Sequence, residues 1–366
     1  MSSLIVEVCK VKKIEKHPNA DRLSIVNVKG WSCIVGLDNY KVGDLVVFVP
    51  PDCIVPNNII YKYNLEYLKK NGRTSTVKLR GYISEGLVLD LPKGKWRAGD
   101  DASKILGIIK YEPPAPKFSV KGSQQTSRKK INPSFHKYTD IENVKNYDNV
   151  FQVGDEVAIT EKIHGSNFRS GLLEINIGKN IPILDKISMW IRKNIFNHKY
   201  EYVVGSHNVQ ITRHSNRKSF YDKDIWNEMY NKYNIKDILL PDMIIYGEVY
   251  GEAHGKGIQD LTYGIKEHAL IVFDIKIEDK YMGWVLVRDF CKVHGLPHVP
   301  ELYVGEYYEG ILEDFTLGQS ILCPDQIREG IVLKMLYEEK HPRIGRKILK
   351  SINPEYLIRK DRTEYK

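Results

Sequence analysis

A short segment containing a lysine, a histidine and a glycine offers the most distinctive chemistry in this chain of 366 residues. It is the run TEKIHGSNF at residues 160–168. Lys162 lies between Ile159 and Ile163, and Gly165 follows shortly after. Taken alone, the segment is compatible with an ordinary solvated lysine in a glycine turn, so its interpretation depends on the rest of the chain.

Four later segments each place charged side chains in an apolar, strand-like context. They are residues 244–251, 270–275, 328–335 and 346–351. A carboxylate or an ammonium group in such a strand is costly unless it is paired or faces a polar cleft. Three lysines and two glutamates placed in this way predict a cleft that holds a polyanion and a divalent cation.

Strands and tight turns must position these groups. Apolar residues alternate before Lys162 and again after it, which predicts a tight turn between two strands. Further strand-like blocks lie at 168–175, 202–205, 243–249, 269–277, 284–287 and 330–334. A helix start is expected at 139–144, and helices are expected at 182–197, 222–236 and 286–294. Strands and helices without regular alternation predict an α+β fold.

The N-terminal part has a different pattern. Short strands are expected at 4–11, 23–28, 33–35 and 45–49, with Gly, Pro, Asn and Asp in the turns between them. Strands at this spacing predict a small β-barrel, with the OB-fold as the leading candidate. Residues 11–28, which contain KIEKHPNADRLSIVNV, resemble the start of tRNA-binding-type OB domains.

Most of the net charge of +9 belongs to this part of the chain. Residues 1–110 hold 18 Lys and Arg against 11 Asp and Glu, a net charge of +7. A basic domain suggests contact with nucleic acid, because each neutralised phosphate releases counterions. Lys78 and Arg80, beside a glycine turn, are the candidate contacts. The alternatives are a lysine-rich solvated surface and a structural pairing of Arg80 with Glu85.

Composition divides the chain into the OB-like domain (1–110), a linker (111–135) and a second domain (136–366). Pro, Ser, Lys and Gln dominate the linker, and its basic run at 127–130 is interpreted as solvated charge, with contact to nucleic acid as the alternative. No apolar run approaches the roughly 18–20 residues that span a bilayer. Five cysteines without a CxxC pair predict reduced thiols, no structural zinc site and a soluble, intracellular protein.

The run KIHGSN, which begins at Lys162, resembles motif I of the covalent nucleotidyltransferases in the form typical of ATP-dependent RNA ligases. DNA ligases and capping enzymes usually show K-x-D-G instead. The stretches around Glu248, Phe273, Glu329 and Lys350 resemble four further motifs of that superfamily. Together with the basic OB-like domain, nearly the whole chain resembles the RNA ligases that carry an N-terminal OB domain, the RNA ligase 5 group.

The resemblance implies that Lys162 attacks ATP to form lysyl-AMP, for which its amine must be neutral. Lys334 and Lys350 would complete the catalytic cations, and Glu248 and Glu329 would position Mg2+ or Mn2+. The implied ATP-binding residues are Glu161, Lys162, Ile163, Asn167, Glu248, Phe273, Lys334, Lys347 and Lys350. Within this set, Phe273 would stack on adenine.

Two positions depart from the family pattern. Lys347 and Lys350 lie three residues apart, where the family usually has two lysines one residue apart. His207 stands where arginine is common, and Arg169 and Arg213 are the nearby cations that could replace it. Arg169 is also a candidate nucleic-acid contact.

The resemblance further implies joining of 5′-phosphate and 3′-hydroxyl ends through an AMP-capped intermediate, at nicks in a duplex with an RNA 3′ end. The expected partner is RNA or an RNA-containing nicked duplex, and the protein is expected to act as a monomer. Only 16 residues follow Lys350, so grip on the substrate should come from the N-terminal domain. A DNA ligase or guanylyltransferase on the same core, and a non-catalytic nucleic-acid-binding protein, are the alternatives.

Overall fold

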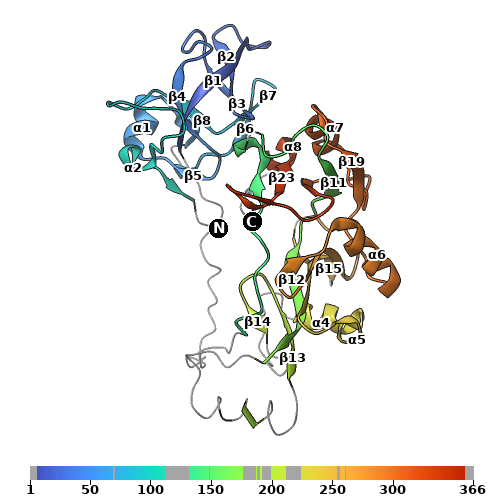
Figure 1. Ribbon diagram of the computed structural model, residues 1–366. Coiled ribbons are helices and arrows are strands. Elements are labelled where there is room, and N and C mark those ends of the chain that lie inside the picture. The colour runs from blue at the N-terminus through green and yellow to red at the C-terminus, as the bar shows by residue number, and fades with distance from the viewer. Residues whose placement is uncertain are drawn as a thin grey trace.

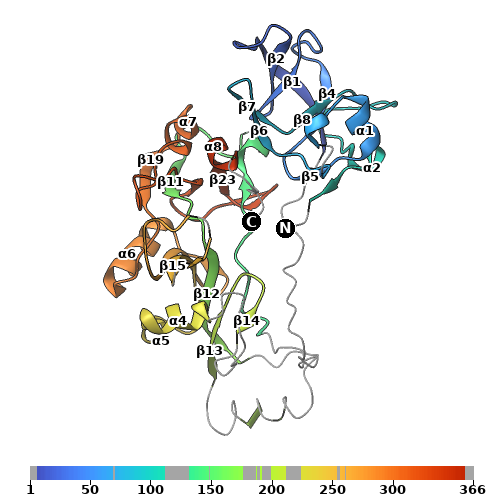
Figure 2. The same cartoon turned by 180° about the vertical axis from the view of Figure 1, so that it is seen from behind.

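The computed structural model describes residues 6–68, 71–111, 132–147, 149–175, 187, 190–191, 199–211, 224–253, 256–259 and 261–358. Within these residues, an OB-fold barrel precedes a larger domain of mixed strands and helices (Figure 1, and from behind in Figure 2). The basic run 127–130 and Arg213 lie outside the described residues, as do most of the expected linker and of the expected helix 182–197.

The barrel is a curled antiparallel sheet in the order β3-β2-β1-β4-β8. Its strands are β1 (Glu7–Lys16), β2 (Leu23–Val28), β3 (Trp31–Gly36), β4 (Leu45–Val49) and β8 (Leu87–Leu89). Smaller elements are β5 (Cys53–Ile54), α1 (Asn57–Lys62), η1 (Glu66–Leu68), β6 (Thr76–Leu79), β7 (Tyr82–Glu85), α2 (Ser103–Leu106) and β9 (Ile109–Lys110). The four predicted strands are confirmed, with shifts of a few residues at their ends.

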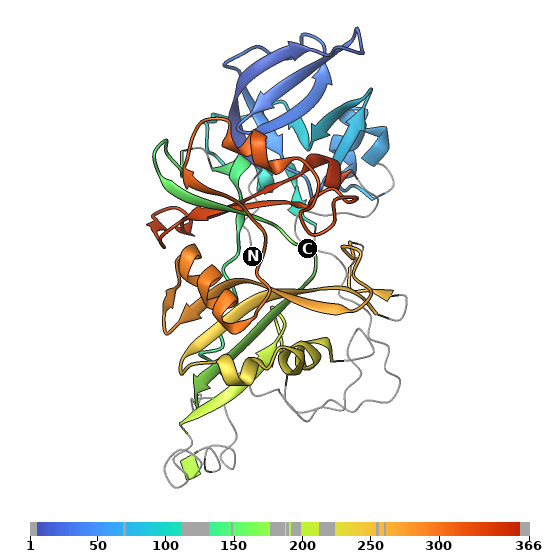
Figure 3. The ribbon, with the colours of Figure 1, turned by 90° about the vertical axis from the view of Figure 1, so that its right-hand side faces the viewer.

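Two sheets form the larger domain, and Figure 3 shows them as layers below the barrel. The first has the order β10 (Glu142–Asn143), β23 (Ile348–Ile352), β20 (Gly330–Met335), β11 (Glu156–Glu161) and β19 (Glu301–Glu306). The second has the order β14 (Gln210–Ile211), β13 (Tyr200–Gly205), β12 (Ser166–Glu174), β15 (Met243–Ala253), β17 (His268–Ile277) and β18 (Lys280–Tyr281), with β16 (Lys256–Gly257) paired to β15. A hairpin of β21 (Lys340–His341) and β22 (Gly345–Arg346) precedes β23.

The main hydrophobic core joins the two sheets. Ala158 and Ile352 from the first sheet belong to the same buried cluster as Phe168 and Val249 from the second. Helices α4 (Ile225–Lys232), α5 (Ile235–Ile238) and α6 (Trp284–His294) add to this cluster, whereas α7 (Ile311–Thr316) packs on the other face of the first sheet. The short helix α8 (Pro354–Leu357) follows β23. The α+β prediction is therefore confirmed.

Three local predictions need correction. The expected strand 284–287 is the first turn of α6, because Trp284, Val287 and Cys291 are buried at helical rather than alternating spacing. The expected helix start at 139–144 is β10, which pairs in parallel with β23 and is followed by the 3-10 turn η2 (Val144–Asn146), capped by the Asn143 side chain. The expected helix 222–236 is divided into α4 and α5, since Asn234 has a φ of 48°.

The turn η2 also holds the barrel against the larger domain. Lys145 Nζ donates to both carboxylate oxygens of Glu85, at 2.6 and 2.7 Å, and lies over the Trp31 ring. Trp31 Nε1 donates to Asn146 Oδ1 at 2.9 Å. We call this set of contacts, Lys145 and Asn146 with Trp31 and Glu85, the domain junction. Because Lys145 engages Glu85, the structure does not support the alternative in which Arg80 pairs with that carboxylate.

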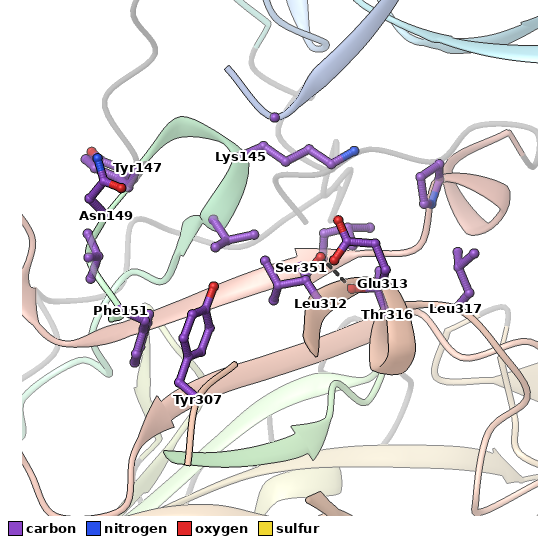
Figure 4. A pocket seen from close by; sticks show the side chains of 15 residues that line it. Lys145, Tyr147, Asn149, Phe151, Tyr307, Leu312, Glu313, Thr316, Leu317 and Ser351 are labelled. Atoms are coloured by element: carbon purple, nitrogen blue, oxygen red, sulfur yellow. Dashed lines mark hydrogen bonds between the residues drawn. The ribbon is translucent and has the colours of Figure 1, made fainter. Parts of the chain in front are cut away.

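Beside the junction lies a hollow of about 400 Å³ (Figure 4). Lys145, Phe151, Tyr307 and Ser351 are among its lining residues. All five cysteines are free thiols. In the part of the chain that the structure describes, no helix has the length and apolar character that a membrane crossing requires.

Candidate active site

The Lys162 turn connects the two sheets of the larger domain. It follows β11, which lies between β19 and β20, and leads into β12, which lies between β13 and β15. Lys162 N donates to Gly330 O at 3.0 Å, so the turn is tied to the start of β20. A Cβ atom at Gly165 would lie 2.5 Å from Val249 O, which explains why glycine is needed there. The predicted turn between strands is confirmed.

Two carboxylates lie beside the Lys162 amine. Lys162 Nζ is 2.7 Å from Glu329 Oε1, and the Glu329 side chain is almost completely buried. Glu248 reaches the same place from β15, where it pairs with Asn167 in the adjacent strand. Burial raises the pKa of Glu248 to about 8, and the charge of Glu329 acts in the same direction while Lys162 opposes it.

The arrangement of these carboxylates fits a divalent cation. Glu248 Oε2 and Glu329 Oε2 are both buried, and neither has a hydrogen-bond partner. An unpartnered buried carboxylate oxygen is costly, and a cation would satisfy it. Among the described residues, no group of three or more His, Cys, Asp or Glu side chains could hold a metal by itself. The remaining ligands would therefore have to be water or phosphate oxygens, which is common for Mg2+.

Two tyrosines, which the sequence did not indicate, fix His164 beside these groups. Tyr356 Oη lies 3.0 Å from His164 Nδ1, and the His164 backbone N–H donates to Tyr263 Oη at 2.7 Å. His164 Nδ1 also lies 3.7 Å from Glu329 Oε2. The two tyrosines thus fix the histidine of the motif next to the carboxylate that contacts Lys162.

A small cavity of about 110 Å³ opens beside Lys162. Seven residues of the predicted ATP-binding set line it, namely Glu161, Lys162, Ile163, Asn167, Glu248, Phe273 and Lys334. Tyr138, Ile141, Thr160, Val299 and Val332 complete the lining. The volume is below the roughly 300–1,000 Å³ of typical ligand pockets, so a whole nucleotide would require the walls to move apart.

Some polar atoms at the cavity wall have hydrogen-bond partners, whereas others have none. Glu161 Oε2 accepts from Ile321 N at 2.8 Å, but Glu161 Oε1 is buried without a partner, as is Asn167 Oδ1. Burial raises the pKa of Glu161. Lys334 Nζ donates to Phe273 O at 3.2 Å and lies 4.5 Å from the centre of the Trp284 ring, and burial lowers the pKa of Lys334.

Side chains alternate between the two faces of the sheet along β23, and this directs Lys347 and Lys350 to opposite faces. Lys350 pairs with Val332, a cavity-lining residue, so its side chain lies on the cavity face of the sheet. The Lys347 side chain lies on the opposite face of the sheet, where the neighbouring Leu349 is buried in the core. Its Nζ binds Asp155 at 2.7 Å and Glu339 at 3.2 Å. The structure therefore does not bring Lys347 to the cavity, contrary to its predicted place in the ATP-binding set.

Arg346, at the end of β22, is a cation near the site that the sequence did not indicate. Its side chain lies on the same side as that of Lys350 and is 8% exposed. Its guanidinium binds Asp274 at 2.9 Å, contacts Glu338 and stacks 3.5 Å from the centre of the Tyr281 ring. Tyr138 Oη donates to the same Asp274 oxygen at 2.7 Å. This buried network holds Phe273, the next residue to Asp274, at the cavity wall.

The remaining candidates lie elsewhere. Arg169 is 2% exposed, donates to the backbone carbonyls of Ser206 and Phe135, and stacks on the Phe135 ring. Such burial conflicts with its predicted contact to nucleic acid. His207 is half-buried, and burial lowers its pKa. Lys78 and Arg80 are exposed at the β6–β7 turn of the barrel.

Barrel and site together define a protein in which an OB-fold domain precedes a nucleotidyltransferase domain. A family model described as RNA ligase matches residues 155–352, and an OB-fold domain model matches residues 5–91. The chain belongs to the RNA ligase family.

Solved structures of a Naegleria gruberi RNA ligase are similar to this chain along nearly its whole length. The form with PPi is 22% identical, with a TM-score of 0.70, and the match covers 99% of this chain and 100% of that one. A mutant with ATP and Mn is 21% identical, with a TM-score of 0.67 and coverage of 96% and 97%. At this identity, the likeness concerns the fold.

A local match links the chain to a different kind of protein. The phenylalanine–tRNA ligase beta subunit of Leptospira interrogans is 32% identical over 85 residues, which are 22% of this chain. The chain spans about a tenth of the length of the curated relatives it matches.

Proposed function

We propose that the chain is an ATP-dependent RNA ligase that joins 5′-phosphate and 3′-hydroxyl ends. The observation that carries this proposal is the placement of the Lys162 amine, 2.7 Å from Glu329, in the wall of a cavity that Glu248, Phe273 and Lys334 also line. Membership of the RNA ligase family supports it. So does the fold shared with a Naegleria gruberi RNA ligase whose structures contain ATP or AMP and Mn.

In the first step, Lys162 Nζ attacks the α-phosphorus of ATP. A P–N bond forms, the bond to the β-phosphate oxygen breaks and pyrophosphate leaves. The amine must first lose a proton, and the hydrogen bond to Glu329 Oε1 orients its lone pair. A divalent cation held by Glu248 and Glu329 would neutralise phosphate charge when bound.

The other cavity residues bind and orient the nucleotide. Lys334 and Lys350 lie on the cavity face of their strands and would stabilise charge that develops on the phosphates. Phe273 offers its ring to adenine. Glu161 Oε1, which has no partner, is an acceptor for the adenine amino group. These contacts are worth most at the in-line geometry that phosphoryl transfer requires.

The second and third steps use the same cations. AMP passes from Lys162 to the 5′-phosphate of the nucleic acid, after which the 3′-hydroxyl attacks that phosphate and AMP leaves. We assign residues 1–110 to nucleic-acid binding and residues 136–366 to this chemistry, in a protein that acts as a monomer. A nick in a duplex with an RNA 3′ end is the expected break.

The test is formation of a covalent nucleotide adduct. The full chain is incubated with labelled ATP or GTP and Mg2+ or Mn2+, and the protein is analysed under denaturing conditions. We expect an adduct with ATP, its loss in Lys162→Ala, and its retention in the control Lys280→Ala, which changes an exposed lysine on β18. An adduct only with GTP would indicate a guanylyltransferase. No adduct with ATP, or an adduct that survives Lys162→Ala, would overturn the proposal.

A further inference from the structure

A third hollow lies on the barrel, separate from the Lys162 cavity and from the hollow beside the domain junction. Strands β3 and β8 stand at the two ends of the five-stranded order, and β3 lies in contact with both β7 and β8. A groove of about 760 Å³ is lined by residues from both end strands, among them Ile34, Val35 and Leu87–Leu89. We call it the seam groove. Its size is that of a ligand site rather than a packing defect.

Three tyrosines line the seam groove. The hydroxyl groups of Tyr40 and Tyr63 donate to the two carboxylate oxygens of Asp90, at 3.1 and 3.0 Å. Asp90 therefore holds both rings in place before any ligand arrives. The third ring, that of Tyr67, lines the same groove and is 46% exposed. Fixed aromatic rings at an accessible groove are the stacking surfaces that unpaired bases use.

Three cations accompany these rings. Lys62 lies 4.8 Å from the centre of the Tyr63 ring, and Lys78 and Arg80 line the groove from β6 and the turn that follows it. All three are exposed, and no ion pair joins any of them to another described residue. Lys62 Nζ donates to Tyr63 Oη at 3.2 Å and is near the charge of Asp90, so Lys78 and Arg80 are the more available cations for phosphates. A guanidinium can bind a phosphate through two hydrogen bonds.

We infer that the seam groove binds an unpaired strand of the RNA substrate, with bases stacked on the tyrosines and phosphates on Lys62, Lys78 and Arg80. A duplex keeps its bases stacked on one another and offers no base faces to the rings, whereas a single strand offers both bases and phosphates. This inference rests on the proposed ligase function and narrows it: the preferred break has a single-stranded segment nearby.

The groove is connected to the site by packed elements. β6, which carries Lys78, contacts α8. α8 contains Tyr356, whose hydroxyl group lies 3.0 Å from His164 in the Lys162 turn. A strand held on the seam groove therefore lies beside β6, which packs against the helix whose Tyr356 contacts His164.

Binding by the full chain tests the inference. Fluorescence anisotropy is measured with a labelled 12-nucleotide single-stranded RNA and with a blunt nicked duplex, across a range of salt concentrations. We expect Tyr67→Ala to weaken single-strand binding about tenfold and Tyr67→Phe to restore it, because phenylalanine keeps the ring on which a base stacks. The double variant Lys78→Ala/Arg80→Ala should also bind more weakly, with a flatter salt dependence.

The controls are Tyr61→Ala and Lys104→Ala, which change exposed residues of the same domain outside the groove. Wild-type binding by the groove variants, or equal losses in the controls, would overturn the inference. So would an equal loss of affinity for the blunt nicked duplex. Thermal unfolding checks that each variant folds, and lysyl-AMP formation is assayed in parallel. Absence of the adduct in the wild type would refute the ligase proposal, whereas groove variants should form it normally.

Discussion

Glu248 shows how the site balances opposing effects on one side chain. Burial favours its neutral form, and so does the negative charge of Glu329, whereas Lys162 favours the carboxylate. Burial is the largest effect and raises the pKa of Glu248 to about 8, from an ordinary value of 4.5. Without a cation, the folded protein therefore keeps a proton at neutral pH that the unfolded chain has lost.

This difference predicts a pH dependence of stability. Between pH 4.5 and 8 the folded state binds more protons at Glu248 than the unfolded state, so the free energy of unfolding should fall as pH rises. We expect this decrease in the free energy of unfolding to be on the order of a few kcal/mol at most, and to be absent in Glu248→Gln. Urea unfolding in EDTA at several pH values measures it, with Glu309→Gln as the exposed control. Parallel curves for the wild type and Glu248→Gln would contradict this expectation.

The sequence could predict a place in the site for some residues but not for others. Lys162, Glu248, Glu329 and Lys334 carry a local signal, a charge in an apolar strand, and the structure brings them together. Tyr263 and Tyr356 carry none, because a chain with 23 tyrosines does not mark two of them. Their partners are defined only by tertiary contact.

At the scale of the element, the start of β20 aligns Glu329 with the Lys162 turn. Gly330 O accepts the Lys162 N–H, and Gly330 has a φ of 154°. A Cβ atom there would lie 2.2 Å from Ser351 O on β23, which is far inside any tolerated contact. Glycine is therefore required for β20 and β23 to approach each other beside the site.

We expect Gly330→Ala to destabilise the protein by roughly 1–3 kcal/mol and to abolish lysyl-AMP formation, because β20 must shift away from β23. Thermal unfolding and the adduct assay measure the two effects. Gly154→Ala is the matched control: Gly154 also has a positive φ, of 93°, but a Cβ atom there meets nothing within 4 Å. Its loss of stability should be smaller and its adduct normal. Equal effects of the two substitutions would show that the contact with Ser351 is unimportant.

The errors in predicting elements have physical causes. Residues 284–287 include β-branched and aromatic side chains, which favour a strand. Packing against the core instead buries side chains at the spacing of the helix α6. The resemblance to the family motif implies that Lys347 binds ATP, whereas strand alternation directs its side chain to the far face of the sheet. In both cases the deciding information is which face is buried, and that is set by the neighbouring elements.

At the scale of the whole molecule, the domain junction determines where the barrel stands. Lys145 binds Glu85 and lies over Trp31, while Asn146 accepts from the Trp31 indole. None of these four residues could be assigned from the sequence, because each is ordinary in its own segment. The division into a barrel and a mixed domain was predictable, since composition and strand spacing change between them; the way the two dock was not.

We expect Lys145→Glu to loosen the barrel, because it places a carboxylate opposite Glu85. Small-angle X-ray scattering should show a larger radius of gyration. Sealing should slow, whereas lysyl-AMP formation stays normal because Lys145 lies away from the Lys162 cavity. Lys137→Glu makes the same change of charge at an exposed lysine and should change neither property. Unchanged scattering and sealing in Lys145→Glu would contradict a role for the junction.

The junction also makes the distance from barrel to nucleophile a fixed length. In the complex that we propose, an RNA strand bound to the barrel must cover that length to reach Lys162. The count of nucleotides between the seated segment and the break is then a property of the fold rather than of the RNA. A strand shorter than this length cannot occupy the barrel and the site at the same time. The rate of sealing should therefore rise abruptly at one strand length rather than gradually.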